Sequence, residues 1–302
     1  MELNRLLDKK LTPQQKSKYE RDNGKFKMLN ILIILPIVTT ILGIFLESMI
    51  VVTISIIVII LCLLFIVFAT KKKNEVYEKI IVPLVLRERF NNIELFNGEL
   101  DVENGYYLSG LGKDYSKFEN RNNLVLQEDR YKVTISKVVT KNKKEHFDEN
   151  EEEKEFEKSF SGIFAYVRIP SEIDIDLIVK ENYKTQKQID EIDKADVQRV
   201  KMNNIEFDTQ YDVVSSDPSV ARRILSLGVM ARILDINKKL GKVISFSIKD
   251  NFLYILVDYD EFLEFSSSKK NEYVNEEQAQ ENMDVIETLD YFIRYIVNLT
   301  EI

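Results

Sequence analysis

The sequence predicts an α+β protein in which an N-terminal two-helix transmembrane hairpin is followed by a cytoplasmic domain with a largely antiparallel sheet and flanking helices. Two uncharged apolar runs near the start predict the hairpin. The strand-like and helix-like segments that follow do not alternate as repeated β-α-β units, which favours an antiparallel sheet over a parallel one. We expect a basic cytoplasmic segment at residues 1–27, the hairpin at 28–70 and the cytoplasmic domain at 71–302.

The two apolar runs, residues 28–46 and 49–69, contain 19 and 21 residues and no charge. At about 1.5 Å per residue, either run spans roughly 28–32 Å as a helix, which is close to the hydrocarbon thickness of a bilayer. The alternatives are a helical hairpin buried in a soluble core and a cleavable signal peptide. Neither run has a wide polar face, and 27 mostly polar residues precede the first run. The pattern therefore favours two membrane spans.

Flanking charge predicts the direction of the hairpin. Residues 1–27 contain eight basic and four acidic residues, and Lys71, Lys72 and Lys73 directly follow the second run. The connection between the runs carries only Glu47. By the positive-inside rule both termini lie in the cytoplasm, as in a multi-pass protein of the inner cell membrane. The lysines also favour an anionic leaflet.

Small residues repeat along both runs. They recur every seven residues on the second run and at helical spacing on the first: Ser48, Ser55, Cys62 and Ala69, and Pro36, Thr40 and Gly43. Because small side chains let membrane helices approach closely, we interpret these positions as the packing faces of the hairpin. Ion and proton pathways normally need charged residues inside the spans, and their absence from the sequence of both runs opposes a channel or transporter.

Composition opposes several other classes of function. One Cys and one His cannot form a disulfide framework or a Cys/His zinc cluster within this chain. A net charge of −8 and a pI of about 5.1 indicate no nucleic-acid partner. Residues 75–302 contain 31 basic and 45 acidic residues. We expect this acidic domain to stand off an anionic leaflet rather than lie flat on it.

The first part of the cytoplasmic domain is predicted as one helix and several strands. Apolar spacing predicts a helix over 74–90 with a kink at its proline. One or two strands are expected within 124–140, followed by a solvated charged loop at 141–158. Residues 160–169 are typical of a strand, in which Gly162 marks a bulge or a close backbone approach.

The middle of the domain is predicted as a strand followed by a helix. The strand covers 205–214, and the helix covers 218–240 with Asp217 as its N-cap and Pro218 at its first position. Gly241 is a suitable residue to end this helix. Its expected apolar stripe is formed by Val220, Ile224, Leu227, Met230, Ala231 and Leu234.

A hairpin and a long helix are expected after that. The hairpin covers 243–257 and turns at Asp250 and Asn251. Its second strand is apolar on both faces, which predicts a central position in the sheet. The helix runs from 275 to about 300, and its expected inward residues are Ala279, Met283, Ile286, Leu289, Ile293, Ile296 and Val297.

Two patterns suggest phosphate binding but are better interpreted as structural. The sequence from Gly110 to Lys113 resembles the end of a phosphate-binding loop. That loop would need glycine where Tyr107 stands and Ser or Thr where Asp114 stands, so a glycine turn is expected instead. Ser215 and Ser216 precede a helix and could bind phosphate. Because Asp217 would repel the anion, we interpret this group as a helix cap.

Other polar residues are also interpreted as structural. Glu172, Asp174 and Asp176 alternate with apolar residues and could hold Ca²⁺ or Mg²⁺, but a solvated strand face explains them as well. His146 could act as a general base, yet it lies in the charged loop and is expected to be solvated. Cys62 lies in the second apolar run and is expected to behave as a small apolar residue. We therefore assign no catalytic, cofactor-binding or metal-binding residue.

The order of these features resembles the bacterial family catalogued as domain of unknown function 3137, over most of the chain from Met28 to Phe265. The residues that carry the resemblance are Phe160, Gly162 and Phe164, then Phe207, Tyr211, Val213, Ser215 or Ser216 and Asp217, then Ala221, Arg222 and Leu225. The chain departs from the family pattern at Arg223, where an aromatic residue is expected, and near Leu227, where a proline is expected. The family has no established reaction or cofactor. The resemblance therefore implies location and architecture, and it suggests a LemA-like membrane protein as a partner.

We expect a membrane-anchored cytoplasmic interaction or scaffold module in bacteria, with the lipid bilayer and another membrane or envelope protein as partners. The alternative is a membrane-tethered enzyme that uses carboxylate acid/base residues, although the sequence does not single out a pair. One residue permits a sharper expectation. Arg222 lies near a helix N-terminus, where its charge opposes the helix dipole. We predict that it forms an ion pair with Asp217, Glu206 or Asp208, with a partner-binding arginine as the alternative.

Overall fold

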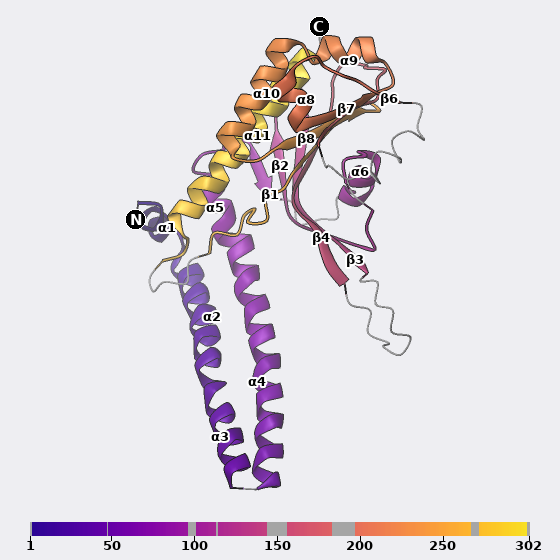
Figure 1. Ribbon diagram of the computed structural model, residues 1–302. Helices are drawn as coiled ribbons and strands as arrows, with labels where there is room; N and C mark the ends of the chain where they lie inside the picture. The colour runs from indigo at the N-terminus through magenta and orange to yellow at the C-terminus, as the bar shows by residue number, and fades with distance from the viewer. Residues whose placement is uncertain are drawn as a thin grey trace, which may run out of the picture. The chain divides into compact units, whose positions relative to one another are not determined.

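The computed structural model describes residues 2–46, 48–95, 101–112, 114–143, 156–182, 197–266 and 272–300 (Figure 1). The chain forms two compact units. The first consists of Met1–Arg89 with Phe265–Glu276, and the second of Phe90–Glu264 with Glu277–Ile302. Each unit therefore contains two separate stretches of the chain.

The first unit is helical. Its helices are α1 (Glu2–Lys10), α2 (Pro13–Leu32), α3 (Ile34–Phe45), α4 (Met49–Val76), a π-helical turn (Tyr77–Ile81) and α5 (Val82–Leu86). α4 packs along both α2 and α3, so the three helices form a long hairpin (Figure 1). The helix predicted over 74–90 is present as the continuation of α4 and ends at Leu86. The π-helical turn ends at Ile81, two residues before Pro83, which cannot donate a backbone hydrogen bond.

The first apolar run is not one continuous helix. α2 ends at Leu32 and α3 begins at Ile34. Pro36 explains this interruption, because a proline lacks the N–H that would bond to the carbonyl four residues earlier, and its ring collides with that carbonyl. The residue four positions before Pro36 is Leu32, so the carbonyl that loses its hydrogen bond belongs to the last residue of α2.

The late segment Phe265–Glu276 belongs to the first unit through contacts with α1 and with the π-helical turn. The Asn4 side chain accepts hydrogen bonds from the backbone N–H of Tyr273 (2.7 Å) and of Val274 (3.1 Å), and it donates one to the carbonyl of Val274 (3.0 Å). The Tyr77 hydroxyl accepts a hydrogen bond from the Phe265 N–H at 3.2 Å. Every polar group of the Asn4 side chain is therefore used to hold a segment that lies 270 residues later.

The second unit is built around a nine-stranded antiparallel sheet, counted within the described residues. Its strands are β1 (Ile93–Leu95), β2 (Lys117–Gln127), β3 (Lys132–Lys143), β4 (Phe156–Arg168), β5 (Leu177–Glu181), β6 (Gln198–Arg199), β7 (Tyr211–Ser215), β8 (Ile244–Lys249) and β9 (Phe252–Val257). The spatial order is β1-β2-β3-β4-β9-β8-β5-β7-β6. The α+β class with a large antiparallel sheet is thus confirmed.

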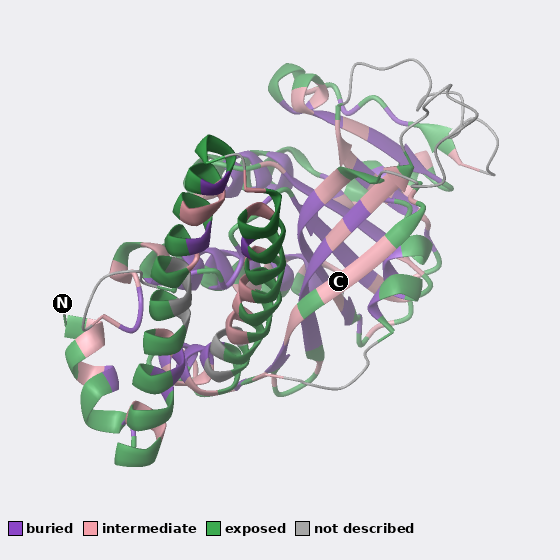
Figure 2. Ribbon diagram, turned by 90° about the horizontal axis from the view of Figure 1, so that it is seen from below, coloured by how far each residue is buried: buried purple, intermediate pink, exposed green. Residues whose placement is uncertain are grey.

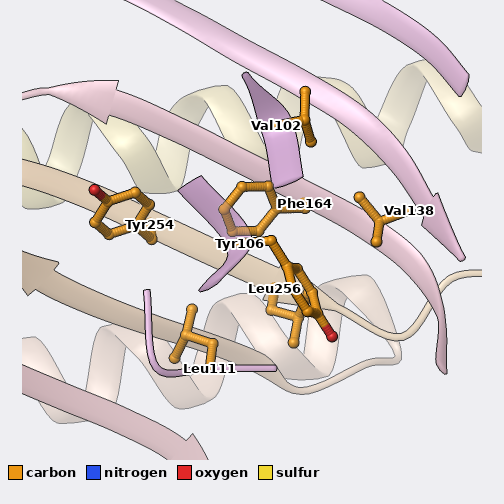
Figure 3. Close-up of a cluster of buried hydrophobic side chains, with 7 residues drawn as sticks. All are labelled: Val102, Tyr106, Leu111, Val138, Phe164, Tyr254 and Leu256. Carbon is orange, nitrogen blue, oxygen red and sulfur yellow. The ribbon is translucent and has the colours of Figure 1, made fainter. Parts of the chain in front are cut away.

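Helices cover both faces of this sheet. They are α6 (Val102–Leu108), α8 (Ile205–Gln210), α9 (Pro218–Ile224), α10 (Leu227–Leu240) and α11 (Glu276–Leu299). α11 packs on one face, where the rings of Phe246 and Phe292 lie 5.4 Å apart. α6 packs on the other, where Tyr106 meets Phe164 edge to face at 5.5 Å (Figure 3). The sheet is therefore the buried middle layer of the second unit.

Three predictions about the second unit are confirmed. The hairpin of β8 and β9 turns at Asp250 and Asn251, whose φ angles of 50° and 62° are those of a tight hairpin turn. β9 lies between β4 and β8, so it is central as predicted. All seven residues predicted to face inward from the last helix are buried in α11.

Two predictions about this unit are wrong in part. The strand expected over 205–214 begins only at Tyr211, because Asn204 caps the helix α8 by accepting a hydrogen bond from the Phe207 N–H at 3.1 Å. The helix expected over 218–240 is broken between α9 and α10. The break rotates the buried face, so Leu227 is 67% exposed, Ala231 is also exposed, and other residues are buried instead: Leu225, Val229 and Ile233.

Candidate functional site

The outer surface of α3 and α4 is apolar. Most of its Ile, Leu, Val and Phe side chains face outward, and Ile50, Phe65 and Phe68 are 74%, 61% and 58% exposed. Figure 2 shows the hairpin largely in the colour of exposed residues. Among the described residues, α4 with its continuation to Leu86 is the one helix long and apolar enough to cross a membrane, and α3 is a shorter apolar helix. An exposed apolar surface of this extent is unfavourable in water.

The less exposed side of the hairpin contains the small residues. Pro36, Gly43 and Ser55 are buried between the helices. The hydroxyls of Thr39 and Ser55 lie 3.0 Å apart and form the hydrogen bond between α3 and α4. A methyl group on Gly43 would lie 3.0 Å from a Val51 methyl and 3.2 Å from the Val52 backbone nitrogen, so a larger residue at this position would be tightly packed against α4. The prediction that small residues form the packing face is therefore confirmed for Pro36, Gly43 and Ser55, whereas the other four predicted positions are half-buried.

Exposed cations lie where the apolar surface of the hairpin ends. On α2 these are Lys18, Lys25 and Lys27, and on α4 they are Lys71 and Lys72. None of the five forms an ion pair within the described part of the chain. The Lys72 ammonium lies 4.7 Å from the centre of the Phe68 ring, so its stem follows apolar surface while its charge faces outward.

The glycine turn predicted at Gly110 is present. Gly110 has a φ of +66°, and a methyl group on Gly112 would lie 2.2 Å from the buried ring of Tyr106. Gly112 therefore permits the loop to pass directly over an aromatic side chain of the core. Lys113, which the phosphate-loop interpretation would need, lies outside the described residues.

The group at Ser215 to Asp217 is a helix cap. The Asp217 carboxylate accepts hydrogen bonds from the N–H groups of Ser219 (2.8 Å) and Val220 (3.1 Å). The Ser216 hydroxyl accepts one from the Asp176 N–H at 3.0 Å. These side chains are therefore engaged with backbone groups, as the capping interpretation predicted.

The predicted acidic face lies before a strand rather than on one, because β5 begins only at Leu177. Glu172 and Asp174 are exposed there. Within the described residues no three His, Cys, Asp or Glu side chains are arranged to hold a metal ion. His146 lies outside the described residues, and Cys62 is a free thiol on α4.

Arg222 does not form the predicted ion pair. Its guanidinium donates to the backbone carbonyl of Lys201 at 3.4 Å. Each of the three expected partners is engaged elsewhere. Asp217 caps α9, Glu206 pairs with Lys238 at 3.1 Å, and Asp208 accepts the N–H of Met202 at 3.1 Å. The prediction was wrong because α8 replaces the expected strand and directs Glu206 and Asp208 elsewhere, and because the Asp217 carboxylate is used by the cap of α9.

A basic hollow lies at one end of the sheet. It is formed by residues 130–132, 168–172 and Asn251, and its volume is about 400 Å³. We call it the sheet-end hollow. Lys132 begins β3 and Arg168 ends β4, one residue beyond the paired Val133 and Val167. The antiparallel register therefore sets two positive side chains opposite each other.

A group of charged residues adjoins the sheet-end hollow. The Arg294 guanidinium bridges two carboxylates, with distances of 2.7 Å to Glu128 and 2.9 Å to Asp290. Burial raises the pKa of Asp290 above its ordinary value, although Arg294 opposes the effect. Burial likewise raises the pKa of Tyr131, a residue of the hollow, to about 12, and the charges of Glu128, Asp290 and Arg294 act on the same hydroxyl. Asp290 is thus a carboxyl group in an environment that favours its neutral form.

A second charged group surrounds a lysine buried in the sheet. Lys137 on β3 is only 5% exposed, and its ammonium contacts the Glu264 carboxylate and the Asp260 carbonyl. The Asp260 carboxylate accepts hydrogen bonds from Lys158 (2.7 Å) and from the Ser161 hydroxyl. These two donors hold the pKa of Asp260 below its usual range. The network fixes the segment that follows β9 to the sheet.

Residues 158–297 match the family model described as Protein of unknown function (DUF3137). The chain resembles that family. No curated protein and no solved structure matches the chain.

The matched part runs from β4 to the last turns of α11 and leaves the apolar hairpin outside it. The resemblance therefore extends further toward the end of the chain than Phe265, and it is supported from Lys158 rather than from Met28. Within it, the DUF3137-like residues have structural positions. Gly162 lies against the backbone of Val257, Phe164 is in the core beside α6, and Ala221 and Leu225 are buried.

The sequence did not indicate the sheet-end hollow or the network around Lys137. Each joins residues that are distant in the chain, such as Lys137 and Glu264, and only the strand register brings them together. A lysine at an otherwise apolar sheet position is the signal that could have identified the second network.

Proposed function

We propose that the protein is a membrane-anchored module in which the end of α2 with α3, and then α4, cross the inner membrane of a bacterium twice. Both termini and the second unit lie in the cytoplasm. The observation that carries the proposal is the exposed apolar surface of α3 and α4. This surface ends at exposed lysines on both arms of the hairpin, on α2 and at the end of α4. In a bilayer the same surface contacts lipid, and the lysines lie among the headgroups.

We further propose that the second unit is an interaction or scaffold module for another membrane or envelope protein, with a LemA-like protein as the candidate suggested by the family resemblance. The excess of acidic residues in 75–302 supports this role. An anionic leaflet repels such a unit, which leaves its surface open to a protein partner. Capture of the full chain from membranes, followed by identification of what crosslinks to it, tests this part.

Reporter fusions test the topology. A reporter placed after residue 10 and another placed after residue 302 should both show a cytoplasmic position. A third reporter inserted at Glu47 should show the opposite side. A periplasmic signal from either terminal fusion contradicts the proposal, as does recovery of the intact chain in the soluble fraction.

A membrane-tethered enzyme is the alternative, and Asp290 is the observation that favours it. One of its carboxylate oxygens is buried without a hydrogen-bond partner among the described residues, and burial raises its pKa. A carboxyl group whose pKa is raised by burial beside a hollow is suited to act as a general acid. If this alternative holds, Asp290→Asn abolishes the function of the protein in cells, while its crosslinking to partners is retained. If the substitution changes neither the function nor the crosslinking, the interaction module is the better explanation.

A further inference from the structure

Two positive side chains in the sheet-end hollow have no partner among the residues that the structure describes. Lys132 and Arg168 are both exposed, and neither forms a hydrogen bond or ion pair through its side chain within the described part of the chain. They are nevertheless set opposite each other at the ends of neighbouring strands. Like charges in that position destabilise a sheet. The arrangement is the more unusual because 45 of the 76 charged residues in 75–302 are acidic.

The walls of the hollow are held in place by hydrogen bonds. Asn251 accepts the N–H of Ile169 with its carbonyl (2.8 Å) and the N–H of Ile173 with its side-chain oxygen (2.7 Å). The Ser171 hydroxyl donates to the carbonyl of Thr300 at 3.0 Å. The loop after β4 is thereby fixed to the β8–β9 turn and to the chain after α11. The side-chain amide nitrogen of Asn251 makes no hydrogen bond to another described residue and can serve as a further donor.

These donors converge on a space that suits a small molecule. A volume of about 400 Å³ lies within the range of small-ligand sites. Arg130, whose guanidinium also donates to the Asn298 side-chain oxygen at 3.5 Å, adds a third positive charge to the lining, and Glu172 contributes one negative charge. An excess of two positive charges, with a guanidinium and an amide among the donors, matches a doubly charged anion with several oxygens. Tyr131 provides an aromatic surface beside them.

The geometry points to a binding site for a phosphate monoester in the sheet-end hollow, with Lys132 and Arg168 as the residues that bind the phosphoryl oxygens. The bound anion relieves the repulsion between these two side chains. The Asn251 amide completes the donor set, Arg130 adds positive charge, and Tyr131 packs against the carbon part of the ligand. This site goes beyond the proposed anchoring role and does not depend on it.

The test uses the full chain in nanodiscs of neutral lipid and measures its melting temperature. Inorganic phosphate or glycerol phosphate, at about 100 times its dissociation constant, should raise the melting temperature by roughly 5–10 °C. The double substitution Lys132→Gln and Arg168→Gln should abolish this rise. Without phosphate, the doubly substituted chain should melt at or above the wild-type temperature, because the like-charge pair is gone. Lys239→Gln, an exposed change on α10 outside the hollow, is the matched control and should keep the full response.

Glu172→Gln provides a second variant whose folding is not at risk, because Glu172 is exposed and makes no side-chain hydrogen bond or ion pair with another described residue. It should lower the dissociation constant for phosphate several-fold. Nanodiscs that contain phosphatidate distinguish the source of the phosphoryl group. A rise with phosphatidate but not with soluble phosphate identifies a lipid headgroup, and the reverse identifies a soluble metabolite.

Three results would overturn the site. The first is an equal rise in the doubly substituted chain, which would show that phosphate acts generally on stability. The second is an equal rise with chloride at matched ionic strength, which would show charge screening. The third is no rise with any of the phosphate probes.

Discussion

Replacing Gly162 by alanine should separate two central strands of the sheet. An added methyl group would lie 2.1 Å from the carbonyl oxygen of Val257 on β9, whereas ordinary van der Waals contacts of such a group begin at 3.4 Å. Relief requires β4 and β9 to move apart by more than about 1 Å, because the obstructing atom belongs to the backbone. The six residue pairs between these strands resist that movement.

We expect Gly162→Ala to lower the free energy of unfolding by about 2–3 kcal/mol, from overpacking of about 3 kcal/mol offset by the reduced flexibility of the unfolded chain. The melting temperature should fall by roughly 4–12 °C. Circular dichroism of the full chain in a neutral detergent measures both quantities. Gly228→Ala is the control, because a methyl group at this exposed position of α10 meets no atom within 4 Å. It should be neutral or stabilising by up to about 1 kcal/mol. Equal melting temperatures for Gly162→Ala and the wild type would refute the reasoning.

Three further predictions can be checked by the same melts. Asp217→Ala removes both hydrogen bonds that cap α9 and should cost about 1 kcal/mol, whereas Asp217→Asn should retain most of the stability. Glu264→Gln should destabilise more than Lys137→Met, since the first takes the nearer of two carboxylates from a buried ammonium and the second removes the buried charge; the opposite order would contradict the role of this pair. Hydrogen bonds from Lys141 and Lys117 lower the pKa of Glu119 from 4.5 to about 2. Its carboxylate therefore stabilises the fold above about pH 4.5 and loses that effect as the pH falls toward about 2, so the gap in melting temperature between wild type and Glu119→Gln should close over that interval.

The sequence could predict the elements whose local signals agree with their burial. The spacing of Ile286, Leu289 and Ile293 indicates the buried face of α11, and Asp250 and Asn251 tolerate the positive φ of the tight turn. The strand from Phe160 combines β-forming residues with a glycine at the one position where the neighbouring backbone excludes a side chain. In these cases local preference and tertiary packing select the same structure.

The failures occur where two local structures share one pattern. Residues 205–210 suit a strand by their alternation, but the Asn204 side chain satisfies a helix N-terminus and selects α8. The apolar periodicity of 218–240 predicts one continuous helix, but the chain breaks at Leu225 and Ser226. The sheet-end hollow lay beyond prediction for another reason. Lys132 and Arg168 indicate a site only because their strands are neighbours in the sheet, and no local sequence pattern predicts which strands pair.

The bonds of Asn4 to Tyr273 and Val274 have a consequence for synthesis of the chain on the ribosome. The partners are separated by 269 and 270 residues, and at about 5–20 residues per second roughly 15–55 s pass between their appearances. The apolar helices emerge early in that interval, and all nine strands emerge before it ends. The first unit therefore lacks the contacts of α1 with Tyr273 and Val274 until every strand of the sheet has been synthesised. Contacts of α1 with Tyr273 and Val274 can form only late, and a protease that cleaves near Asn4 during most of this interval would act on chains whose strands have not all been made.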